Sequence, residues 1–217
     1  MEAPGRLAEI AEGVSQFFTR VRTTIGPGEY VHIAVGYSEV TFSSSTLELS
    51  FKHDRQGIQV AKWMILNLED ELVDIGLDIE KEMCTADQLE ELNLSIFPER
   101  RRISKLGIAI LRSQPRRAIL KYLSSPKQGL DGHIRWPFPD LTEFGALAGV
   151  NDLPMILRRV RAQSQATGLP ESFWPKNIVN LCLIPCGKAF GDHNEVIAEI
   201  DSVMRDNGGT LTIMPST

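Results

Sequence analysis

Nine basic residues, most of them in consecutive pairs or triplets, are the side chains of this sequence best suited to chemistry. An arginine guanidinium donates several hydrogen bonds in one plane, and this geometry matches the oxygen atoms of a phosphate. We therefore predict that these residues bind a polyanion, most plausibly nucleic acid. The alternative is that they neutralise carboxylates, within one chain or between copies of it. The nine residues are Arg100, Arg101, Arg102, Arg116, Arg117, Lys121, Arg158, Arg159 and Arg161.

The charge of the chain changes sign along its length. Residues 1–97 contain 7 Lys and Arg against 17 Asp and Glu, a net charge of −10. Residues 98–165 contain 13 against 5, a net charge of +8, and residues 166–217 contain 3 against 6, a net charge of −3. A local excess of positive charge attracts polyanions and speeds their encounter with the protein. The basic middle of an acidic protein thus supports the same prediction.

A second group of residues has the types needed for nucleophilic catalysis. Cys186 follows a predicted strand, and Asp192 and His193 come a few residues later. A thiol near a histidine at the end of a strand is a known arrangement in open α/β sheets, so a small cysteine-dependent enzyme is one hypothesis. Cys182 and Cys186 together provide too few ligands for a closed zinc site. We therefore predict neither a metal nor a cofactor, and we assign no catalytic residue.

The loop Trp136-Pro137-Phe138-Pro139 presents two aromatic residues on a backbone stiffened by proline. Exposed, such a loop would suit insertion into a partner or contact with a membrane interface. Folded inward, it would cover the core. The sequence leaves both possibilities open.

The composition restricts the class of protein. A hydrophobic content of 42% with 24% charged residues is typical of a globular protein and argues against disorder. No apolar run reaches the roughly 18–20 residues that a membrane-spanning helix needs, although peripheral membrane contact stays open. Three cysteines cannot form a disulfide scaffold, and no secretory signal is visible, so we expect a cytoplasmic protein.

The first segment, residues 1–97, predicts helices around a small antiparallel sheet. Apolar residues at helical spacing indicate a helix within 5–24, and β-rich stretches indicate strands at 30–37 and 46–53. A longer helix is expected at 56–75. A capping-box pattern indicates a short helix at 85–92.

The central segment, residues 98–168, predicts mainly helix. Residues 103–111 fit either a helix or a buried strand, and residues 115–123 fit a helix with proline in its first turn. Two further helices are expected at 141–148 and 153–165.

These last two helices resemble a helix-turn-helix unit over about 20 residues. The resemblance lies in Phe144-Gly145, with a small residue for close helix packing, and in Gly149-Val150 at the expected turn. It implies that the helix starting near Leu153 is a recognition helix and that its arginines face nucleic acid. A plain structural pair of helices is the alternative.

The last segment, residues 169–217, predicts a strand, a helix and a strand. Residues 178–184 and 210–214 are apolar and β-rich, and residues 194–205 have an apolar helical face with Gly208-Gly209 after it. The expected geometry is a right-handed crossover between two parallel strands.

Together the elements predict an α+β fold in three segments: acidic 1–97, basic 98–168, and a 169–217 unit packed with one of the others. The leading functional prediction is a non-catalytic polyanion-binding protein. A self-associating structural or assembly protein, such as a viral matrix-like or scaffold subunit, is the alternative, because acidic and basic segments could meet between copies.

Overall fold

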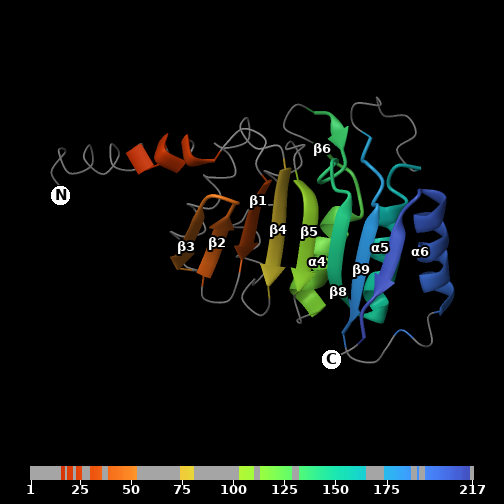
Figure 1. Cartoon of the computed structure of the whole chain (residues 1–217). Coiled ribbons are helices and arrows are strands. Elements are labelled where there is room, and N and C mark those ends of the chain that lie inside the picture. Colours follow the sequence, from red (N-terminus) through yellow and green to blue (C-terminus); the bar gives the residue numbers. More distant parts are fainter. Residues whose placement is uncertain are drawn as a thin grey trace, which may run out of the picture.

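A computed structural model gives the fold of the chain, which is built on one mixed eight-stranded sheet (Figure 1). The structure describes residues 30–35, 39–52, 74–80, 103–109, 113–128, 132–164, 174–186, 190 and 194–215, and residues 16–25 except 18 and 22. The strands are β1 (Tyr30–Val35), β2 (Glu39–Ser43), β3 (Glu48–Lys52), β4 (Asp74–Glu80), β5 (Ile103–Ala109), β8 (Glu143–Ala148), β9 (Asn180–Pro185) and β10 (Thr210–Ile213). The remaining elements are α4 (Ser113–Leu123), β6 (Lys127–Gln128), β7 (Ile134–Arg135), η2 (Val150–Asp152), α5 (Leu153–Val160) and α6 (Asn194–Asp206).

Six strands of the sheet are parallel, and their order in space follows their order in the chain. The sheet runs β10-β9-β8-β5-β4-β1-β2-β3, and each neighbouring pair from β10 to β1 is parallel. Right-handed crossovers between such strands place every connecting helix on the same face. Figure 1 shows α4 and α5 behind the sheet, as this rule requires.

The core lies between the sheet and these helices. Burial alternates along β8 and β9, so that Phe144 and Ala146 on β8 and Leu181 and Leu183 on β9 are buried. Ile119 and Leu120 of α4, Ile156 and Val160 of α5, and Ile200 and Met204 of α6 belong to the same apolar cluster. The opposite face of the sheet, in the parts described, contains less buried residues such as Lys105, Gly145 and Cys182.

Strands β1, β2 and β3 form an antiparallel meander at one end of the sheet. The predicted antiparallel strands in this part of the chain are confirmed, and β2 occupies part of the serine-rich connection between them. The end of the N-terminal helix is also confirmed in its described residues, where Val21 and Ile25 are buried. The α+β class is confirmed, and all three charge segments contribute strands to one sheet.

The predicted helix at 141–148 is wrong, because residues Glu143–Ala148 form strand β8. Phe144, Ala146 and Ala148 alternate in burial, and β8 pairs with β5 on one side and β9 on the other. Eight residues are too few to distinguish the two periodicities, and Gly145 disfavours a helix by about 1 kcal/mol relative to alanine. The pair that resembles a helix-turn-helix is therefore a strand, a short 3-10 turn and a helix.

The end of another predicted helix is wrong, because it lies in strand β4. Asp74 and Ile75, the last residues of the helix expected at 56–75, lie in β4, which pairs in parallel with both β1 and β5. The apolar residues Ile75, Leu77 and Ile79 alternate with others, which is the period of a strand. The rest of that helix and the helix expected at 85–92 lie outside the described residues.

Most other predictions for the second half of the chain are confirmed. The sequence left a helix or a buried strand open for residues 103–111, and residues 103–109 form a strand. Helix α4 has the expected proline in its first turn. Helix α5 is shorter than expected, since it ends at Val160 and turns follow it. Strand β9, helix α6 and strand β10 form the expected parallel crossover unit.

Candidate functional site

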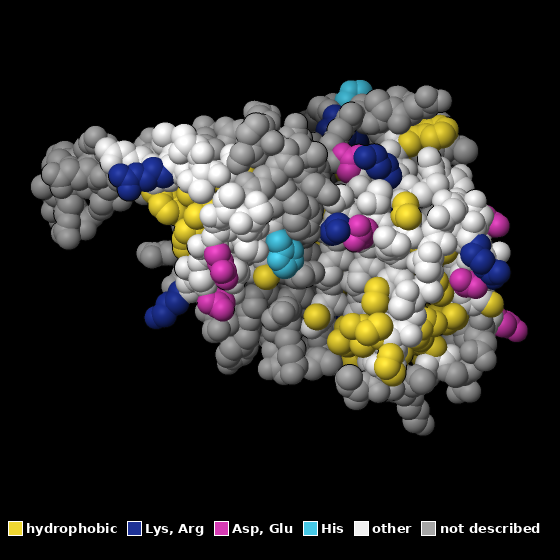
Figure 2. All heavy atoms as spheres, in the orientation of Figure 1, with side chains coloured by type: hydrophobic (Ala, Val, Ile, Leu, Met, Phe, Trp, Pro, Cys, Tyr) yellow, Lys and Arg dark blue, Asp and Glu magenta, His cyan; other side chains and the backbone are white. Residues whose placement is uncertain are grey.

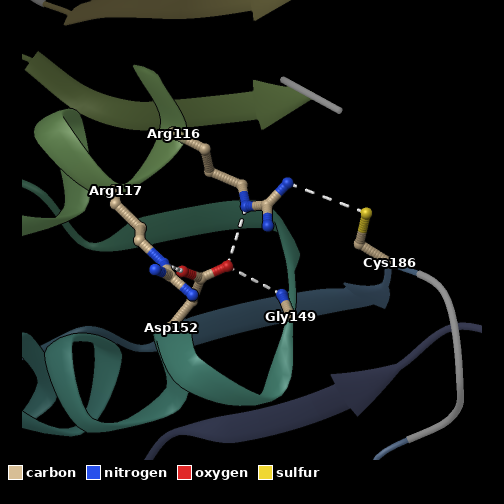
Figure 3. Close-up of polar contacts among 5 residues, drawn as sticks. All are labelled: Arg116, Arg117, Gly149, Asp152 and Cys186. Atoms are coloured by element: carbon tan, nitrogen blue, oxygen red, sulfur yellow. Dashed lines mark hydrogen bonds and ion pairs between the residues drawn. The ribbon is translucent and has the colours of Figure 1, made fainter. Parts of the chain in front are cut away.

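Five residues from three successive crossovers meet near the carboxyl ends of β8 and β9 (Figure 3). We call them the Asp152 cluster: Arg116 and Arg117 from α4, Gly149 after β8, Asp152 at the start of α5, and Cys186 after β9. Parallel strands bring their carboxyl ends to one edge of the sheet, so residues far apart in the sequence become neighbours there.

The carboxylate of Asp152 is the centre of this cluster. Its Oδ2 accepts hydrogen bonds from Arg116 Nε at 2.8 Å and from the backbone N–H of Gly149 at 2.8 Å. Its Oδ1 accepts a longer bond from Arg117 Nε at 3.4 Å. Asp152 and Arg116 are both buried, whereas the Arg117 side chain is 47% exposed. One buried negative charge thus faces two positive charges, and the cluster retains a net charge of +1.

Gly149 allows Arg116 to approach this closely. A Cβ atom at residue 149 would lie 3.3 Å from Arg116 Nη2 and 3.4 Å from Asp152 Oδ2. The glycine that the sequence presents as a turn residue therefore makes room for a buried guanidinium. Neither Asp152 nor this role of Gly149 was predicted. The available signal is that Asp152 is the sole acidic residue between Phe144 and Pro170.

The thiol of Cys186 borders the cluster. Arg116 Nη1 donates to Cys186 Sγ at 3.7 Å, and the backbone N–H of Cys186 donates to the carbonyl of Ala148. Among the described residues, Cys182 and Cys186 are half-buried thiols outside any disulfide bond. Asp192 and His193, the other residues of the cysteine-enzyme hypothesis, lie outside the described residues. In the part of the chain that the structure describes, no group of three or more His, Cys, Asp or Glu residues could hold a metal.

Arg159 is the second buried arginine of the predicted site. Its side chain is 1% exposed, and Nη2 donates to the backbone carbonyl of Phe138 at 3.1 Å. Its Nε has no hydrogen-bond partner among the described residues. Burial lowers the pKa of Arg159 to about 10, since an apolar environment disfavours the charged form. Arg159 is inaccessible to a polymer in this structure.

Arg159 is hydrogen-bonded to the loop of residues 136–139, which contains two aromatic residues. Trp136 and Phe138 are 3% and 0% exposed, so the loop folds inward and covers the core. Phe138 has a φ of 48°, a left-handed conformation that costs energy for a bulky residue. The bond from Arg159 to its carbonyl helps to hold that conformation. Insertion of this loop into a partner would require it to open.

Three cations remain on the outside of the helical layer. Arg117 and Lys121 lie four residues apart and therefore one above the other on α4, and Arg158 is exposed on α5. Helices α4 and α5 pack side by side. We call Arg117, Lys121 and Arg158 the α4–α5 surface. No ion pair of Lys121 or Arg158 exists within the described residues.

The other predicted residues are distributed differently. Arg161 pairs with Glu199 of α6, and Arg100, Arg101 and Arg102 lie outside the described residues. On the sheet face opposite α4 and α5, Figure 2 shows the coloured Lys and Arg side chains singly and mostly beside Asp or Glu. One such pair is Lys105 with Glu143, at 3.1 Å. The structure therefore brings only part of the predicted set together.

No protein-family model matches the chain, and neither a curated protein nor a solved structure matches it significantly. Among the described residues, no helix has both the length and the apolar character needed to cross a bilayer.

Proposed function

We propose that this protein binds a polyanion through the α4–α5 surface, and that the polyanion is nucleic acid. The observation that carries the proposal is the composition of the two helices. Neither α4 nor α5 contains an Asp or Glu residue, and three of their basic side chains point away from the sheet. Two adjacent helices whose exposed charged residues are all cations form a local field that attracts phosphates.

The Asp152 cluster strengthens this field. Asp152 accepts a bond from Arg117 at 3.4 Å, but its shorter contacts are with Arg116 and Gly149, both at 2.8 Å. Because Arg116 already balances the charge of Asp152, the charge of Arg117 is largely uncompensated. The half-exposed Arg117 guanidinium can therefore bind a phosphate without breaking a neutral ion pair.

The three cations of the α4–α5 surface lie close to one another on the two helices. Helices α4 and α5 run in the same direction, and Arg117 lies level with the start of α5, where it contacts Asp152. Lys121 lies four residues, about 6 Å, further along α4, and Arg158 lies six residues, about 9 Å, beyond Asp152 along α5. These lengths place Lys121 and Arg158 at similar heights on neighbouring helices. The three charges thus form a compact triangle.

Such a surface predicts sequence-independent binding. Flexible Lys and Arg side chains on the outside of two helices contact phosphates, whereas sequence is recognised by groups held against base edges in a groove. Because residues Glu143–Ala148 form strand β8, α5 is not the second helix of a helix-turn-helix unit, and the resemblance gives no support to base recognition by α5. Contacts to the backbone are the binding mode that the geometry favours.

The test is a salt series with a fluorescent oligonucleotide, in single-stranded and duplex forms. Binding by the α4–α5 surface should weaken steeply as salt increases, because each neutralised phosphate releases counterions. The double variant Lys121→Glu with Arg158→Glu should lower the affinity by at least tenfold and reduce the slope of log K against log salt by about 2. Arg117 is left unchanged, since it contacts the buried Asp152.

The matched control is the double variant Lys176→Glu with Arg205→Glu. It changes the net charge by the same amount, and both side chains are exposed on elements other than α4 and α5: Lys176 lies before β9, and Arg205 lies on α6. It should bind like the unmodified protein. Salt-independent binding, no binding at low salt, or an equal loss in both double variants would refute the proposal.

A further inference from the structure

Strand β3 forms one end of the sheet, and its outer edge is unpaired among the described strands. It pairs with β2 on its inner side, and no described strand pairs with its outer side. Figure 1 shows β3 at the far end of the sheet from β10. An edge strand of this kind presents backbone N–H and C=O groups that another strand can use.

The five residues of β3 are complementary to themselves in the reverse direction. The strand reads Glu48-Leu49-Ser50-Phe51-Lys52, with an acid at one end and a base at the other. If a second copy of β3 runs antiparallel and the pair is centred on Ser50, each Glu48 lies opposite Lys52 of the second copy. Each Leu49 then lies opposite the second copy's Phe51, and the two Ser50 residues face each other.

This register also keeps the two faces of the sheet consistent. In an antiparallel pair, directly opposite residues lie on the same face. In β3 the exposed residues are Glu48, Ser50 and Lys52, while Leu49 and Phe51 are half-buried against the core. A two-fold axis perpendicular to the sheet therefore joins apolar face to apolar face and charged face to charged face.

We propose that β3 is a self-association edge and that its partner is β3 of a second copy of this chain. Charge complementarity selects this partner, because opposite-charge pairs form at both ends of the strand only in the antiparallel self-register. The other edge, β10, has the sequence Thr-Leu-Thr-Ile and contains no charge that could fix a register. Each Lys52 would lie between Glu39 of its own β2, its register partner, and Glu48 of the second copy. The proposal does not depend on polyanion binding.

Charge exchange is the experiment that tests it, read out by sedimentation velocity of the full chain over a range of concentrations. Glu48→Lys places Lys opposite Lys, and Lys52→Glu places Glu opposite Glu, twice in each dimer. Like charges at directly opposite positions repel, so each single variant should dimerise at least tenfold more weakly than the unmodified chain. Circular dichroism establishes that each variant is folded.

Two rescues separate this geometry from a general loss of stability. The double variant Glu48→Lys with Lys52→Glu restores opposite charges and should dimerise again. An equimolar mixture of the two single variants should form heterodimers, because every pair is then Lys opposite Glu. Thr212→Lys on β10, the control for the other edge, should leave dimerisation unchanged.

The opposite outcome has an equally clear physical meaning. Charged residues on an edge strand often prevent strand pairing, and in that case the unmodified chain and all variants stay monomeric. That result, or a dimer that persists in both single variants, overturns the proposal. A dimer lost through Thr212→Lys would place the interface at β10 and would overturn it as well.

Discussion

Arg116 and Arg117 are neighbours in the sequence, yet they belong to two different regions of the molecule. Arg116 is buried inside the Asp152 cluster, whereas Arg117 lies at the exposed rim of that cluster and also belongs to the α4–α5 surface. Arg158 and Arg159 repeat the contrast, with Arg158 exposed and Arg159 buried. Successive helical residues point about 100° apart, so one member of each pair faces the sheet and the other faces solvent. Residue type alone therefore does not distinguish a structural arginine from a binding arginine.

The two regions differ in how their charges affect the stability of the fold. A buried charge must be paired and hydrogen-bonded, because transfer from water is expensive. An exposed charge remains hydrated and contributes little to stability, so it is available for a ligand. Four substitutions and one control test this contrast.

The largest effect is expected in the buried cluster. Asp152→Asn removes the negative charge that Arg116 faces and should lower the free energy of unfolding by about 3–5 kcal/mol. Urea denaturation measures the change. The control is Asp140→Asn, which breaks the more exposed pair with Lys176 and should cost less than about 1 kcal/mol. Equal losses of unfolding free energy in the two variants would mean that the buried ion pairs of Asp152 stabilise the fold no more than the more exposed pair of Asp140 with Lys176.

An intermediate effect is expected for the second buried arginine. Arg159→Met keeps a long apolar side chain but removes one of the two hydrogen bonds to the carbonyl of Phe138, which keeps its bond from the backbone N–H of Leu141 at 3.1 Å. The free energy of unfolding should fall by about 0.5–1.5 kcal/mol, the usual net contribution of one hydrogen bond. Removing a buried charge offsets part of this loss. A decrease as large as that of Asp152→Asn would show that Arg159 has a stronger partner than this carbonyl.

The smallest effect on stability is expected at the surface. Lys121→Ala and Arg158→Ala should each change the free energy of unfolding by no more than about 0.5 kcal/mol. Urea denaturation again provides the measurement. A loss above 1 kcal/mol in either variant would place that residue with the structural arginines and weaken its proposed role in binding.

Local patterns predicted much of the fold. The spacing of apolar residues and the positions of proline and glycine predicted four elements: helices α4 and α6 and strands β9 and β10. In each of these elements the local pattern fits one type of secondary structure better than the other. The predicted antiparallel strands at the other end of the sheet were also found. Strand β8 was missed because Glu143–Ala148 has six residues and fits a helix and a strand equally well; its two strand neighbours decided the outcome.

The candidate site was predictable only in composition. An excess of eight positive charges in residues 98–165 is evident from the sequence, and it directed attention to the residues that form the α4–α5 surface. Arg116 and Arg159 contribute to the same excess of charge, but their side chains are buried in the structure. Asp152 was not predicted at all, since a single carboxylate has no pattern in sequence.

The sequence by itself determined the periodicities of most elements and the net charge of each segment, because both depend on residues that are close in the chain. Tertiary structure decided which side of α4 and α5 faces the sheet, and it brought residues 116, 149, 152 and 186 to one edge. Those outcomes depend on contacts between distant segments, whose free energies exist only once the parallel strands have aligned. The division of the arginines between interior and surface is therefore a property of the fold.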